Sequence, residues 1–340
     1  MTGHYRHGFG PAATSLLSAQ RVRFVNMSGQ HDTPILVLDA DAAEIVAELE
    51  ARRPGRYVAV GAPEQLDDSD ATICLGSPGF VLAAADRLTG LRWIQSTWAG
   101  VQPLLPLLQQ REDLILTGVK GIFGPLMAEY VFGWIAALER RLFDYRRQQT
   151  EGVWQPQRER SSAGRRMVVL GIGSIGRHLA AVAQAFGLEV VGVSRSGEPV
   201  AGIDRIYPVS AVLEAVADAD YLVCVLPDTP ATRDLIDGRM LAALAPGAML
   251  LNVGRGTAVV DADLVAALES GSLGAAVLDV FREEPLPPLH PFWTTSNLYI
   301  TPHMAAVTPA SALVDVFLDN LARWEAGQPL RYQVDPARGY

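Results

Sequence analysis

The sequence has few cysteines for its length. Only two occur among its 340 residues, Cys74 and Cys224, and both lie in apolar, strand-like segments, ATICLG and YLVCVL. Two buried thiols in separate strands do not make a disulfide framework of the kind that small secreted proteins use. We therefore predict a protein of a reducing compartment, the cytoplasm.

The sequence also lacks an excess of positive charge. Its 28 Lys and Arg residues are outnumbered by 37 Asp and Glu residues, which gives a formal net charge of −9. Nucleic acid and anionic membranes would repel such a chain, so neither is expected as its main partner. No apolar run approaches the length of about 18 residues that a membrane span needs. No paired Cys/His cluster indicates a metal, so we predict no metal site.

The first 32 residues differ from the rest of the chain because they show no sustained hydrophobic period. They also lack the long apolar region and the small-residue cleavage site of a secretory signal peptide. We predict that residues 1–32 form a flexible N-terminal arm. Met27 stands just before the first predicted strand and is an alternative start, in which case residues 1–26 are an upstream extension.

The most informative segment begins with a short apolar run, Met167 to Leu170, which is typical of a buried parallel strand. It leads into GIGSIG at residues 171–176, which has the spacing G-x-G-x-x-G, and then into a helical apolar pattern. The first glycine permits a sharp turn, the second lets a pyrophosphate approach the backbone, and the third lets the helix pack closely. The free N–H groups of the helix start would then bind the phosphates. The predicted dinucleotide contacts of this turn are Gly171, Gly173, Ser174, Ile175 and Gly176.

The end of the following strand bears on the choice of dinucleotide. About 20 residues past the glycines, an NAD site usually carries Asp or Glu to bind the ribose 2′-hydroxyl. Here Ser194, Arg195 and Ser196 occupy that place. A guanidinium and two hydroxyls would hold a 2′-phosphate that a carboxylate would repel. The sequence therefore favours NADP(H), with NAD(H) as the alternative if Arg195 is only a solvated charge or stacks on adenine.

Strand and helix signals alternate through the rest of the chain. Before residue 118, five apolar runs separated by helical segments predict a small parallel sheet with helices on both faces. Residues from Gly124 to Gln149 predict one long helix, apolar at its start and basic at its end. The polar segment from Thr150 to Arg165 is a candidate domain boundary. The signals after it predict six parallel strands, which make a complete dinucleotide-binding domain.

Three ionisable side chains follow strands of this second sheet. Arg255 comes after AMLLNV, Glu284 after AAVLDV and His303 after LYIT. Active groups in open α/β sheets gather at the carboxyl ends of the strands. Each residue alone has an ordinary structural explanation, as a surface charge, a loop residue before proline or a structural histidine. Together they indicate a centre for the reduction of a carbonyl group.

The chain from about Pro34 onward resembles the D-2-hydroxyacid dehydrogenase family. The motifs that carry the resemblance are GIGSIG, LPDTPATRDLI, LLNVGRGTAVVD, AVLDVFREEPLP and ITPHMAAVT. The segments SRS, FDYRRQQTEGVWQP and TWAGVQPLL look most like its NADP-dependent glyoxylate/hydroxypyruvate reductase branch. This implies an NAD(P)-dependent oxidoreductase that reduces a small 2-oxo acid, such as glyoxylate or hydroxypyruvate, to the D-2-hydroxy acid with NADPH.

The resemblance implies a role for each candidate residue. His303 would be the general acid that protonates the carbonyl oxygen. Glu284 would bind the far ring nitrogen, orient the imidazole and favour its charged form. Arg255 would grip the substrate carboxylate in a bidentate manner and polarise the carbonyl group. The predicted substrate contacts are Trp98, Ala99, Gly100, Val101, Arg255 and His303, and the further cofactor contacts are Leu226, Pro227, Thr232, Val253 and Asp279.

Two departures from the family pattern stand beside this agreement. Many relatives carry Asp after the Gly-Val of the substrate loop, where this chain has Gln102. The pocket for the 2′-phosphate has one clear basic residue, Arg195, and Glu198 weakens its basic character. Two alternatives stay open: an NAD-dependent D-2-hydroxyacid dehydrogenase of a larger substrate, and a dinucleotide-sensing binding protein of the same fold.

The predicted fold is therefore α/β, with two doubly wound parallel-sheet domains. A Rossmann-type dinucleotide-binding domain, residues 131–304, is inserted in a flavodoxin-like substrate-binding domain, residues 33–130 and 305–340. We expect the two lobes to close over the substrate about a helical hinge. The resemblance also implies a homodimer that associates through the cofactor-binding domain. Trp154 is either a surface anchor or part of that subunit interface.

Overall fold

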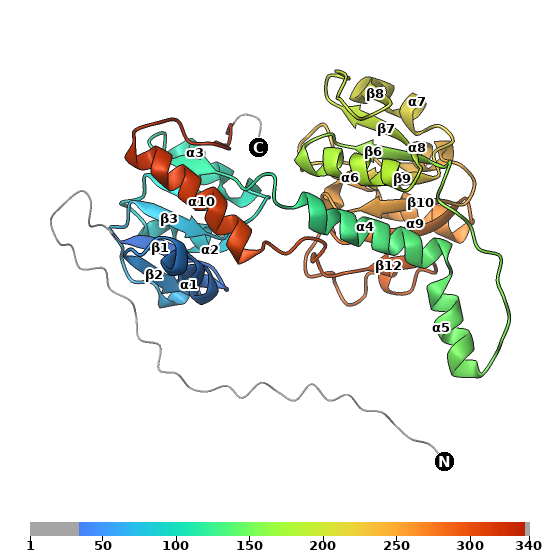
Figure 1. The fold of residues 1–340 in the computed structure, drawn as a ribbon, viewed down its shortest axis with the longest axis horizontal. Coiled ribbons are helices and arrows are strands. Elements are labelled where there is room, and N and C mark those ends of the chain that lie inside the picture. Colours follow the sequence, from blue (N-terminus) through green and yellow to red (C-terminus); the bar gives the residue numbers. More distant parts are fainter. Residues whose placement is uncertain (1–33, 337–340) are drawn as a thin grey trace, which may run out of the picture.

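The computed structural model describes residues 34–336, so the predicted arm at residues 1–32 lies outside the described residues. Within this range the chain forms two α/β domains, each built around one sheet of parallel strands, as predicted (Figure 1). The two lobes are joined by a narrower waist. The first lobe contains the beginning and the end of the described chain, and the second contains the middle.

The first sheet has five strands in the order β2-β1-β3-β4-β5, which is the flavodoxin-like arrangement. Most of its strands are short apolar runs that are buried on both faces, as parallel strands between two helix layers should be, whereas the edge strand β2 is partly exposed. The strands are β1 (Ile35–Leu38), β2 (Tyr57–Val60), β3 (Ile73–Gly76), β4 (Trp93–Ser96) and β5 (Ile115–Thr117). The helices around them are α1 (Ala42–Arg52), α2 (Pro78–Ala83), α3 (Leu105–Gln110) and α10 (Ala310–Glu325), with 3-10 turns η1 (Pro63–Gln65), η2 (Ala85–Arg87) and η3 (Gln102–Leu104).

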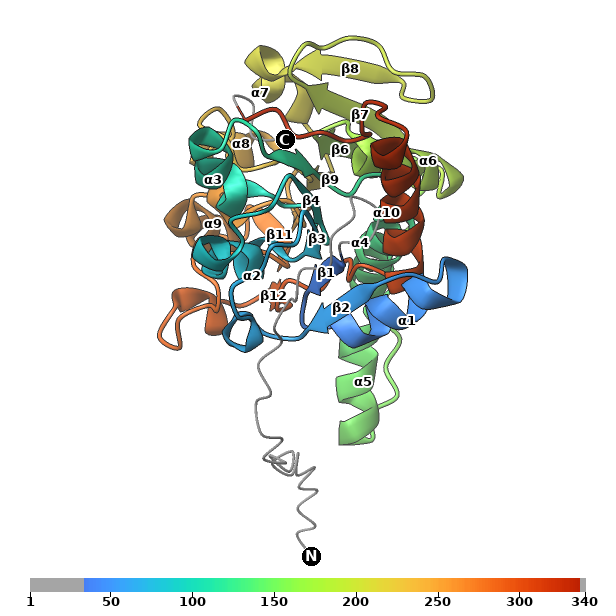
Figure 2. The same ribbon diagram turned by 90° about the vertical axis from the view of Figure 1, so that its left-hand side faces the viewer.

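The last helix returns to the first domain. Figure 2 shows α10 beside α1 on one face of the five-stranded sheet. Two ion pairs join the helices, one between Arg52 and Asp315 and one between Arg53 and Glu325, the second at 2.7 Å. Beneath them the ring of Phe317 stacks on Trp93 with 5.4 Å between centroids. The chain therefore leaves this domain and re-enters it after the second one is complete.

The second sheet has seven parallel strands in the order β12-β11-β10-β9-β6-β7-β8. Six were predicted, so that number was wrong by one. β8 lies at the edge and includes Pro208. An edge strand tolerates proline because the N–H that proline lacks is not needed for pairing on the open side. The strands are β6 (Arg166–Leu170), β7 (Glu189–Ser194), β8 (Arg205–Pro208), β9 (Tyr221–Cys224), β10 (Ala248–Asn252), β11 (Leu273–Leu278) and β12 (Leu298–Ile300).

Helices cover both faces of this sheet. They are α4 (Gly124–Glu139), α6 (Ser174–Ala185), α7 (Val212–Val216), α8 (Gly238–Ala243) and α9 (Asp261–Glu269), with 3-10 turns η4 (Val209–Ala211), η5 (Gly256–Ala258) and η6 (Pro291–Trp293). α6 follows β6 directly, and α4 packs beside α6 on the same face of the sheet. The strand order and the helix after β6 are those of a Rossmann-type domain.

The long helix predicted from Gly124 to Gln149 is wrong, because the structure has two helices there. α4 ends at Glu139, and α5 (Leu142–Glu151) begins after Arg141, whose backbone lies in the left-handed region with a φ of 53°. The guanidinium of Arg141 pairs with Asp144 in the first turn of α5 at 2.7 Å, which stabilises the new helix start. α5 projects from the second lobe (Figure 1).

Two side chains connect the hydrophobic cores of the lobes. Met127 of α4 and Ile175 of α6 pack against the core of the second domain and also against the cluster between α1, α10 and the first sheet. α4 therefore starts at the junction and continues along the second domain.

Both cysteines are buried free thiols, as predicted, and burial raises the pKa of Cys224 to about 12. Among residues 34–336, no helix is long and apolar enough to cross a membrane.

Candidate active site

The glycine turn after β6 has the geometry that a pyrophosphate needs. Gly171 has a φ of 102°, which side chains rarely allow, and a Cβ at Gly176 would lie 2.0 Å from the carbonyl oxygen of Gly171. A Cβ at Gly173 would meet no heavy atom within 4 Å. In the described chain, the N–H groups of Gly173, Ser174 and Ile175 donate no hydrogen bond to protein. Open space beside free N–H groups at a helix start fits an anionic phosphate group.

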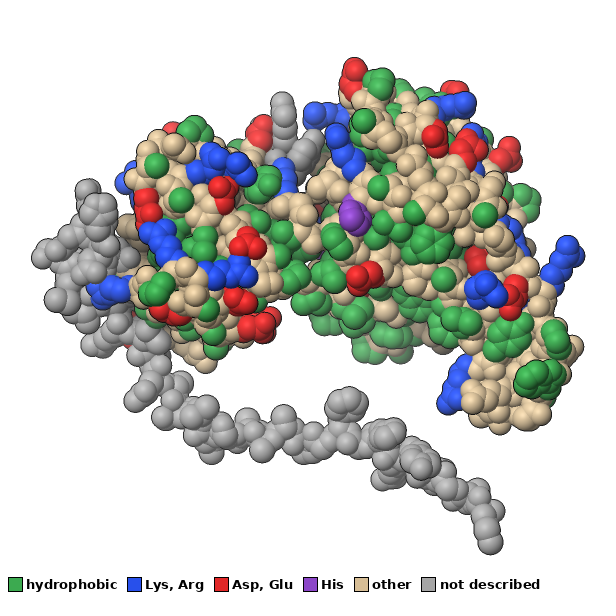
Figure 3. Space-filling view, viewed as in Figure 1, with side chains coloured by type: hydrophobic (Ala, Val, Ile, Leu, Met, Phe, Trp, Pro, Cys, Tyr) green, Lys and Arg blue, Asp and Glu red, His purple; other side chains and the backbone are tan. Residues whose placement is uncertain are grey.

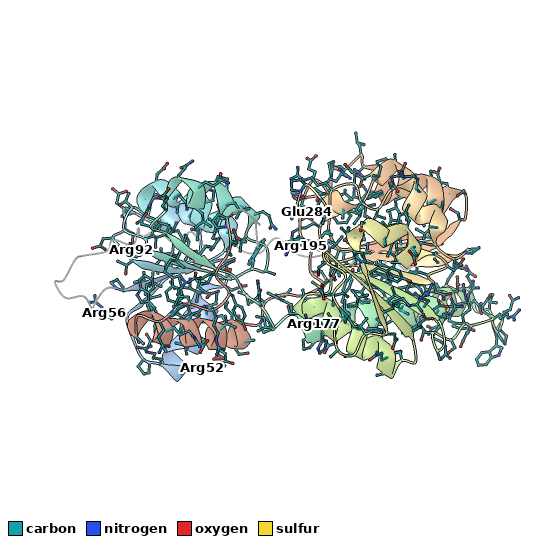
Figure 4. The ribbon with its side chains drawn as sticks, turned by 90° about the horizontal axis from the view of Figure 1, so that it is seen from above. Arg52, Arg56, Arg92, Arg177, Arg195 and Glu284 are labelled. Carbon is teal, nitrogen blue, oxygen red and sulfur yellow. The ribbon has the colours of Figure 1, made fainter. Side chains whose placement is uncertain are left out.

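The end of β7 carries the three residues predicted for the 2′-phosphate. The hydroxyl of Ser194 accepts a hydrogen bond from the N–H of Gly197 at 3.0 Å, and that of Ser196 accepts one from Glu198 at 3.4 Å. These bonds fix the turn that presents the exposed side chain of Arg195. Figure 4 shows Arg195 and Glu284 on the side of the second domain that faces the first.

The loops after β9 and β10 pack closely against each other. A Cβ at Gly254 would lie 2.7 Å from the backbone nitrogen of Leu226. The hydroxyl of Thr232 lies 2.7 Å from the carbonyl oxygen of Pro227 and accepts a hydrogen bond from Thr229 at 2.9 Å, so it stabilises its own loop. The predicted contact of Thr232 with a phosphate stays a prediction. The structure thus brings Leu226 and Pro227 to the carboxyl edge of the sheet, next to the strand end at Val253.

His303 and Glu284 come together across the ends of β11 and β12. The Nδ1 of His303 lies 2.7 Å from one carboxylate oxygen of Glu284, and the other oxygen accepts a hydrogen bond from the N–H of Phe281 at 2.8 Å. Partial burial acts to raise the pKa of Glu284, but the hydrogen bonds from His303 and Phe281 outweigh it and lower that pKa. Glu284 is therefore an ionised partner for the imidazole, whose Nε2 is left for another group.

Arg255 is the third member of this group. Its guanidinium donates a hydrogen bond to the carbonyl oxygen of Gly254 at 2.6 Å, and it reaches the first domain, where a Cβ at Gly100 would lie only 2.0 Å from it. Burial lowers the pKa of Arg255, while the charges of Glu284 and Asp228 act in the opposite direction. Arginine stays charged under these conditions. A cation therefore lies between the two domains beside the histidine and glutamate pair.

The loop that carries His303 is attached to Asp279, which is only 1% exposed. One carboxylate oxygen of Asp279 accepts hydrogen bonds from the hydroxyl of Thr301 at 2.6 Å and from the N–H of Met304 at 2.8 Å. The other oxygen accepts one from Ala305 at 2.9 Å. Asp279 thus organises the loop, and three of about four acceptor positions of its carboxylate are in use. Its predicted contact with a nicotinamide carboxamide stays a prediction.

On the opposite side, the loop after β4 presents backbone donors. The hydroxyl of Ser96 accepts a hydrogen bond from the N–H of Trp98 at 3.0 Å and donates one to its carbonyl oxygen at 2.7 Å. Within residues 34–336, the N–H groups of Ala99, Gly100 and Val101 make no hydrogen bond to protein. The side chain of Trp98 is 54% exposed beside them. Free donors next to the guanidinium of Arg255 suit an anion such as a carboxylate.

Arg282, which the sequence did not single out, joins the catalytic loops. The Nε of Arg282 donates to the carbonyl oxygen of Val259 at 3.0 Å, and its guanidinium also pairs with Asp234. Arg282 thereby attaches the loop of Glu284 to the segment after Arg255. Its position next to a motif glutamate was the only sequence signal, and it does not reveal the partners. Among the described residues, no group of His, Cys, Asp and Glu could hold a metal ion.

Comparisons with known proteins agree with this geometry. Residues 132–305 match the family model described as D-isomer specific 2-hydroxyacid dehydrogenase, NAD binding domain. The chain is 32% identical over 306 residues to glyoxylate/hydroxypyruvate reductase A of Serratia proteamaculans, covering 88% of this chain and 97% of that protein.

Solved structures show the same similarity in three dimensions. A D-isomer specific 2-hydroxyacid dehydrogenase family protein of Aeromonas salmonicida is 40% identical, with a TM-score of 0.84 over 90% of this chain and 99% of that one. An NADPH-dependent glyoxylate/hydroxypyruvate reductase of Sinorhizobium meliloti, solved with NADP and sulfate, is 30% identical, with a TM-score of 0.79 over 91% and 100%. The chain belongs to the D-isomer specific 2-hydroxyacid dehydrogenase family and is an oxidoreductase with an NAD-binding domain.

Proposed function

We propose that this protein reduces a small 2-oxo acid, with glyoxylate and hydroxypyruvate foremost, to the D-2-hydroxy acid, using NADPH and His303 as general acid. The observation that carries the proposal is the pair of His303 and Glu284, 2.7 Å apart, on the same face between the domains as the guanidinium of Arg255. A ketone with a carboxylate needs a proton donor and a cation side by side, and this arrangement supplies both.

The two ring nitrogens of His303 would have different roles, Nδ1 in holding the ring and Nε2 in proton transfer. Glu284 accepts a hydrogen bond from Nδ1, which orients the ring and stabilises the imidazolium. Nε2 then carries the proton that goes to the carbonyl oxygen of the substrate. Because the pKa of Glu284 is lowered, its carboxylate stays ionised while the histidine gains and loses this proton.

Arg255 and the loop of residues 99–101 would hold the substrate carboxylate from opposite sides. The guanidinium offers a planar pair of donors that lysine could not copy. Its partial burial strengthens its attraction for an anion, because fewer water molecules screen the charge. The free N–H groups of Ala99, Gly100 and Val101 would complete the site when the domains close. Trp98 would limit the size of the substrate at the mouth.

The cofactor would lie along the carboxyl edge of the seven-stranded sheet. The turn of residues 171–176 would hold its pyrophosphate, and Leu226, Pro227 and Val253 would line its nicotinamide end, with Asp279 near the carboxamide. When bound, the dinucleotide supplies the hydride. Ser194, Arg195 and Ser196 support a preference for the 2′-phosphate of NADP(H). The similar Sinorhizobium meliloti reductase was solved with NADP, and a Xanthobacter autotrophicus relative with NADPH.

The proposal includes the domain bounds and a homodimer. Residues 33–130 and 305–340 would bind the substrate, and residues 131–304 the dinucleotide. Apolar side chains on the projecting α5 and the segment after it support a subunit interface: Leu142 is 54% exposed, Phe143 47% and Trp154 96%. Figure 3 shows hydrophobic side chains on this projection and along the lower part of the same lobe. Burial of such a surface is what a stable dimer requires.

A panel of 2-oxo acids of increasing size, each assayed with NADPH and with NADH, tests the proposal. We expect kcat/KM to be highest for glyoxylate or hydroxypyruvate and at least about tenfold higher with NADPH, since one charge-assisted contact favours the 2′-phosphate. A preference for NADH and a bulky 2-oxo acid would instead identify a dehydrogenase of a larger substrate. Tight dinucleotide binding without turnover of any 2-oxo acid would identify a sensor.

A further inference from the structure

The helix α4, which begins at the junction of the domains, also contacts the loop that carries His303. Met127 of α4 packs against the cores of both domains. One turn later, the hydroxyl of Tyr130 lies 2.6 Å from the hydroxyl oxygen of Thr301, just before His303 in the chain. Residues three apart lie on neighbouring positions of a helix face. α4 therefore contacts the domain junction with one residue and the histidine loop with the next.

The direction of the hydrogen bonds in this contact follows from a count of protons. The hydroxyl of Thr301 has one proton, and it donates that proton to the carboxylate of Asp279 at 2.6 Å. Because Thr301 gives its only proton to Asp279, the proton between Tyr130 and Thr301 must come from the tyrosine. Burial raises the pKa of Tyr130 to about 12, which keeps the phenol protonated at neutral pH. The chain thus runs from Tyr130 to Thr301 to Asp279.

Asp279 connects these hydrogen bonds to the loop of His303. Its carboxylate accepts the N–H groups of Met304 and Ala305, and its carbonyl oxygen accepts the N–H of His303 at 2.9 Å. The backbone of His303 lies in the left-handed region, with a φ of 51°, which is uncommon for residues other than glycine, although histidine is among those that adopt it more often. The bonds to Asp279 hold the loop in this conformation. A change in the position of this carboxylate would therefore change the direction of the imidazole.

We propose that Tyr130 is a positioning residue for the reaction: through Thr301 and Asp279 it holds the loop of His303 in place. The helix α4, which begins at the junction of the domains, would then help to support the active site. The inference rests on the proposed role of His303 as general acid. Tyr130 touches neither the imidazole nor the cation of Arg255 among the contacts of the described chain. Its effect should appear in the proton-transfer step and not in cofactor affinity.

The test is the variant Tyr130→Phe, which removes one oxygen atom and keeps the ring. We expect kcat with a 2-oxo acid and NADPH to fall roughly fivefold to tenfold, the effect of one hydrogen bond of ordinary strength. The Kd for NADPH and the melting temperature should stay close to those of the parent. The KM for the 2-oxo acid should stay close to that of the parent, because Arg255 keeps its contacts.

The matched control is Tyr221→Phe. The hydroxyl of Tyr221 donates to Glu139 at the far end of the same helix, at 2.9 Å, so this variant removes an equivalent bond away from His303. We expect its kcat and its KM for the 2-oxo acid to equal those of the parent. Equal losses of kcat in both variants would overturn the proposal, because any loosening of α4 would then suffice.

A double-mutant cycle with Thr301→Val separates a chain of bonds from independent contacts. Once Thr301 has lost its hydroxyl, Tyr130 no longer has a hydrogen bond to the loop of His303, so Tyr130→Phe should add no further loss of kcat. Fully additive losses would contradict the inference.

The variant His303→Asn distinguishes a failure of the proposed function from a failure of the role of Tyr130. If that variant keeps its turnover, the proposed function fails; if it loses turnover while Tyr130→Phe behaves like the parent, only the role of Tyr130 fails.

Discussion

The turns after β1 and β6 occupy the same place in two parallel sheets, yet their chemistry is opposite. After β1, the side chain of Asp39 fills the turn: its carboxylate accepts hydrogen bonds from the N–H of Asp41 at 3.0 Å and from the hydroxyl of Thr97 at 2.7 Å. After β6, Gly171 and Gly173 leave the turn without side chains, and the N–H groups at the start of α6 are free within the described chain.

The comparison shows what makes one of two similar scaffolds a phosphate site. In the first domain, a built-in carboxylate satisfies the donors and ties β1 to the loop after β4. In the second, the same region is left for an external anion. The family match to an NAD binding domain covers residues 132–305, which include only the second turn. One turn thus stabilises a loop that would face the substrate, and the other would bind the cofactor.

A carboxylate placed in the second turn, like the one in the first, should have the largest effect on cofactor binding. Gly173 has an extended backbone, and a Cβ there meets no heavy atom, so Gly173→Asp should fold normally. Its carboxylate would stand where the pyrophosphate is expected. Like charges in a binding site cost several kcal/mol, so we expect the Kd for NADPH to rise by about a hundredfold or more.

The control for this change is Gly173→Ser, which adds a side chain without a charge. Fluorescence titration with NADPH and the melting temperature of each variant measure the outcome. A Gly173→Asp protein that binds NADPH as tightly as the parent would break the comparison.

A change on the opposite side of the site should reduce turnover instead of cofactor binding. In Gly100→Ala, the new Cβ would lie 2.0 Å from the guanidinium of Arg255, which must move. A displacement of about 1 Å at a catalytic group costs on the order of a hundredfold, so we expect a loss of that size in kcat/KM for the 2-oxo acid. Gly79→Ala in the same domain is the control, since its Cβ meets nothing within 4 Å. Equal activities of the two variants would show that Arg255 has another position available.

Removal of the built-in carboxylate should affect stability more than chemistry. Asp39→Ala leaves the buried hydroxyl of Thr97 and the part-buried N–H of Asp41 without their acceptor. We expect a loss of about 1 to 3 kcal/mol in the free energy of unfolding. Chemical denaturation measures it, and the Kd for NADPH should not change. A large loss of cofactor affinity would mean that the two turns do not act separately.

The smallest effect on kcat/KM at neutral and mildly acidic pH is expected from the protonation of Glu284. Its pKa is lowered from the ordinary value of 4.5, so the stability it contributes is complete above that value and is lost as the pH falls through the lower, folded one. Neutral or mildly acidic buffers should therefore leave Glu284 unchanged. A profile of kcat/KM against pH checks this. An acidic limb at a pH above about 4.5 that disappears in Glu284→Gln would contradict it.

Local signals were sufficient for much of the fold and the site. The glycine turn, the alternation of strands and helices, and the ends of β10, β11 and β12 predicted both sheets and singled out Arg255, Glu284 and His303, which the structure brings together. These features depend on neighbouring residues and on the rule that active groups follow parallel strands.

Contacts between distant residues could not be read in the same way. No periodicity connects Asp39 with Thr97, Arg282 with Val259, or Tyr130 with Thr301, which is 171 positions away. The break between α4 and α5 was missed for a related reason. Arg141 is a good helix former, and neither its pairing with Asp144 nor the bond from Tyr221 to Glu139 at the helix end can be read from helix propensity.

The most direct test of the account is kcat for NADPH-dependent reduction of a 2-oxo acid by His303→Asn, compared with the parent. Asparagine tolerates the left-handed backbone of residue 303, so the loop should keep its shape. The account predicts that kcat falls about a hundredfold to ten-thousandfold, as expected for a lost general acid, while the Kd for NADPH is retained. A variant that binds NADPH and keeps kcat within about twofold of the parent would contradict it, because proton transfer would then not depend on this imidazole.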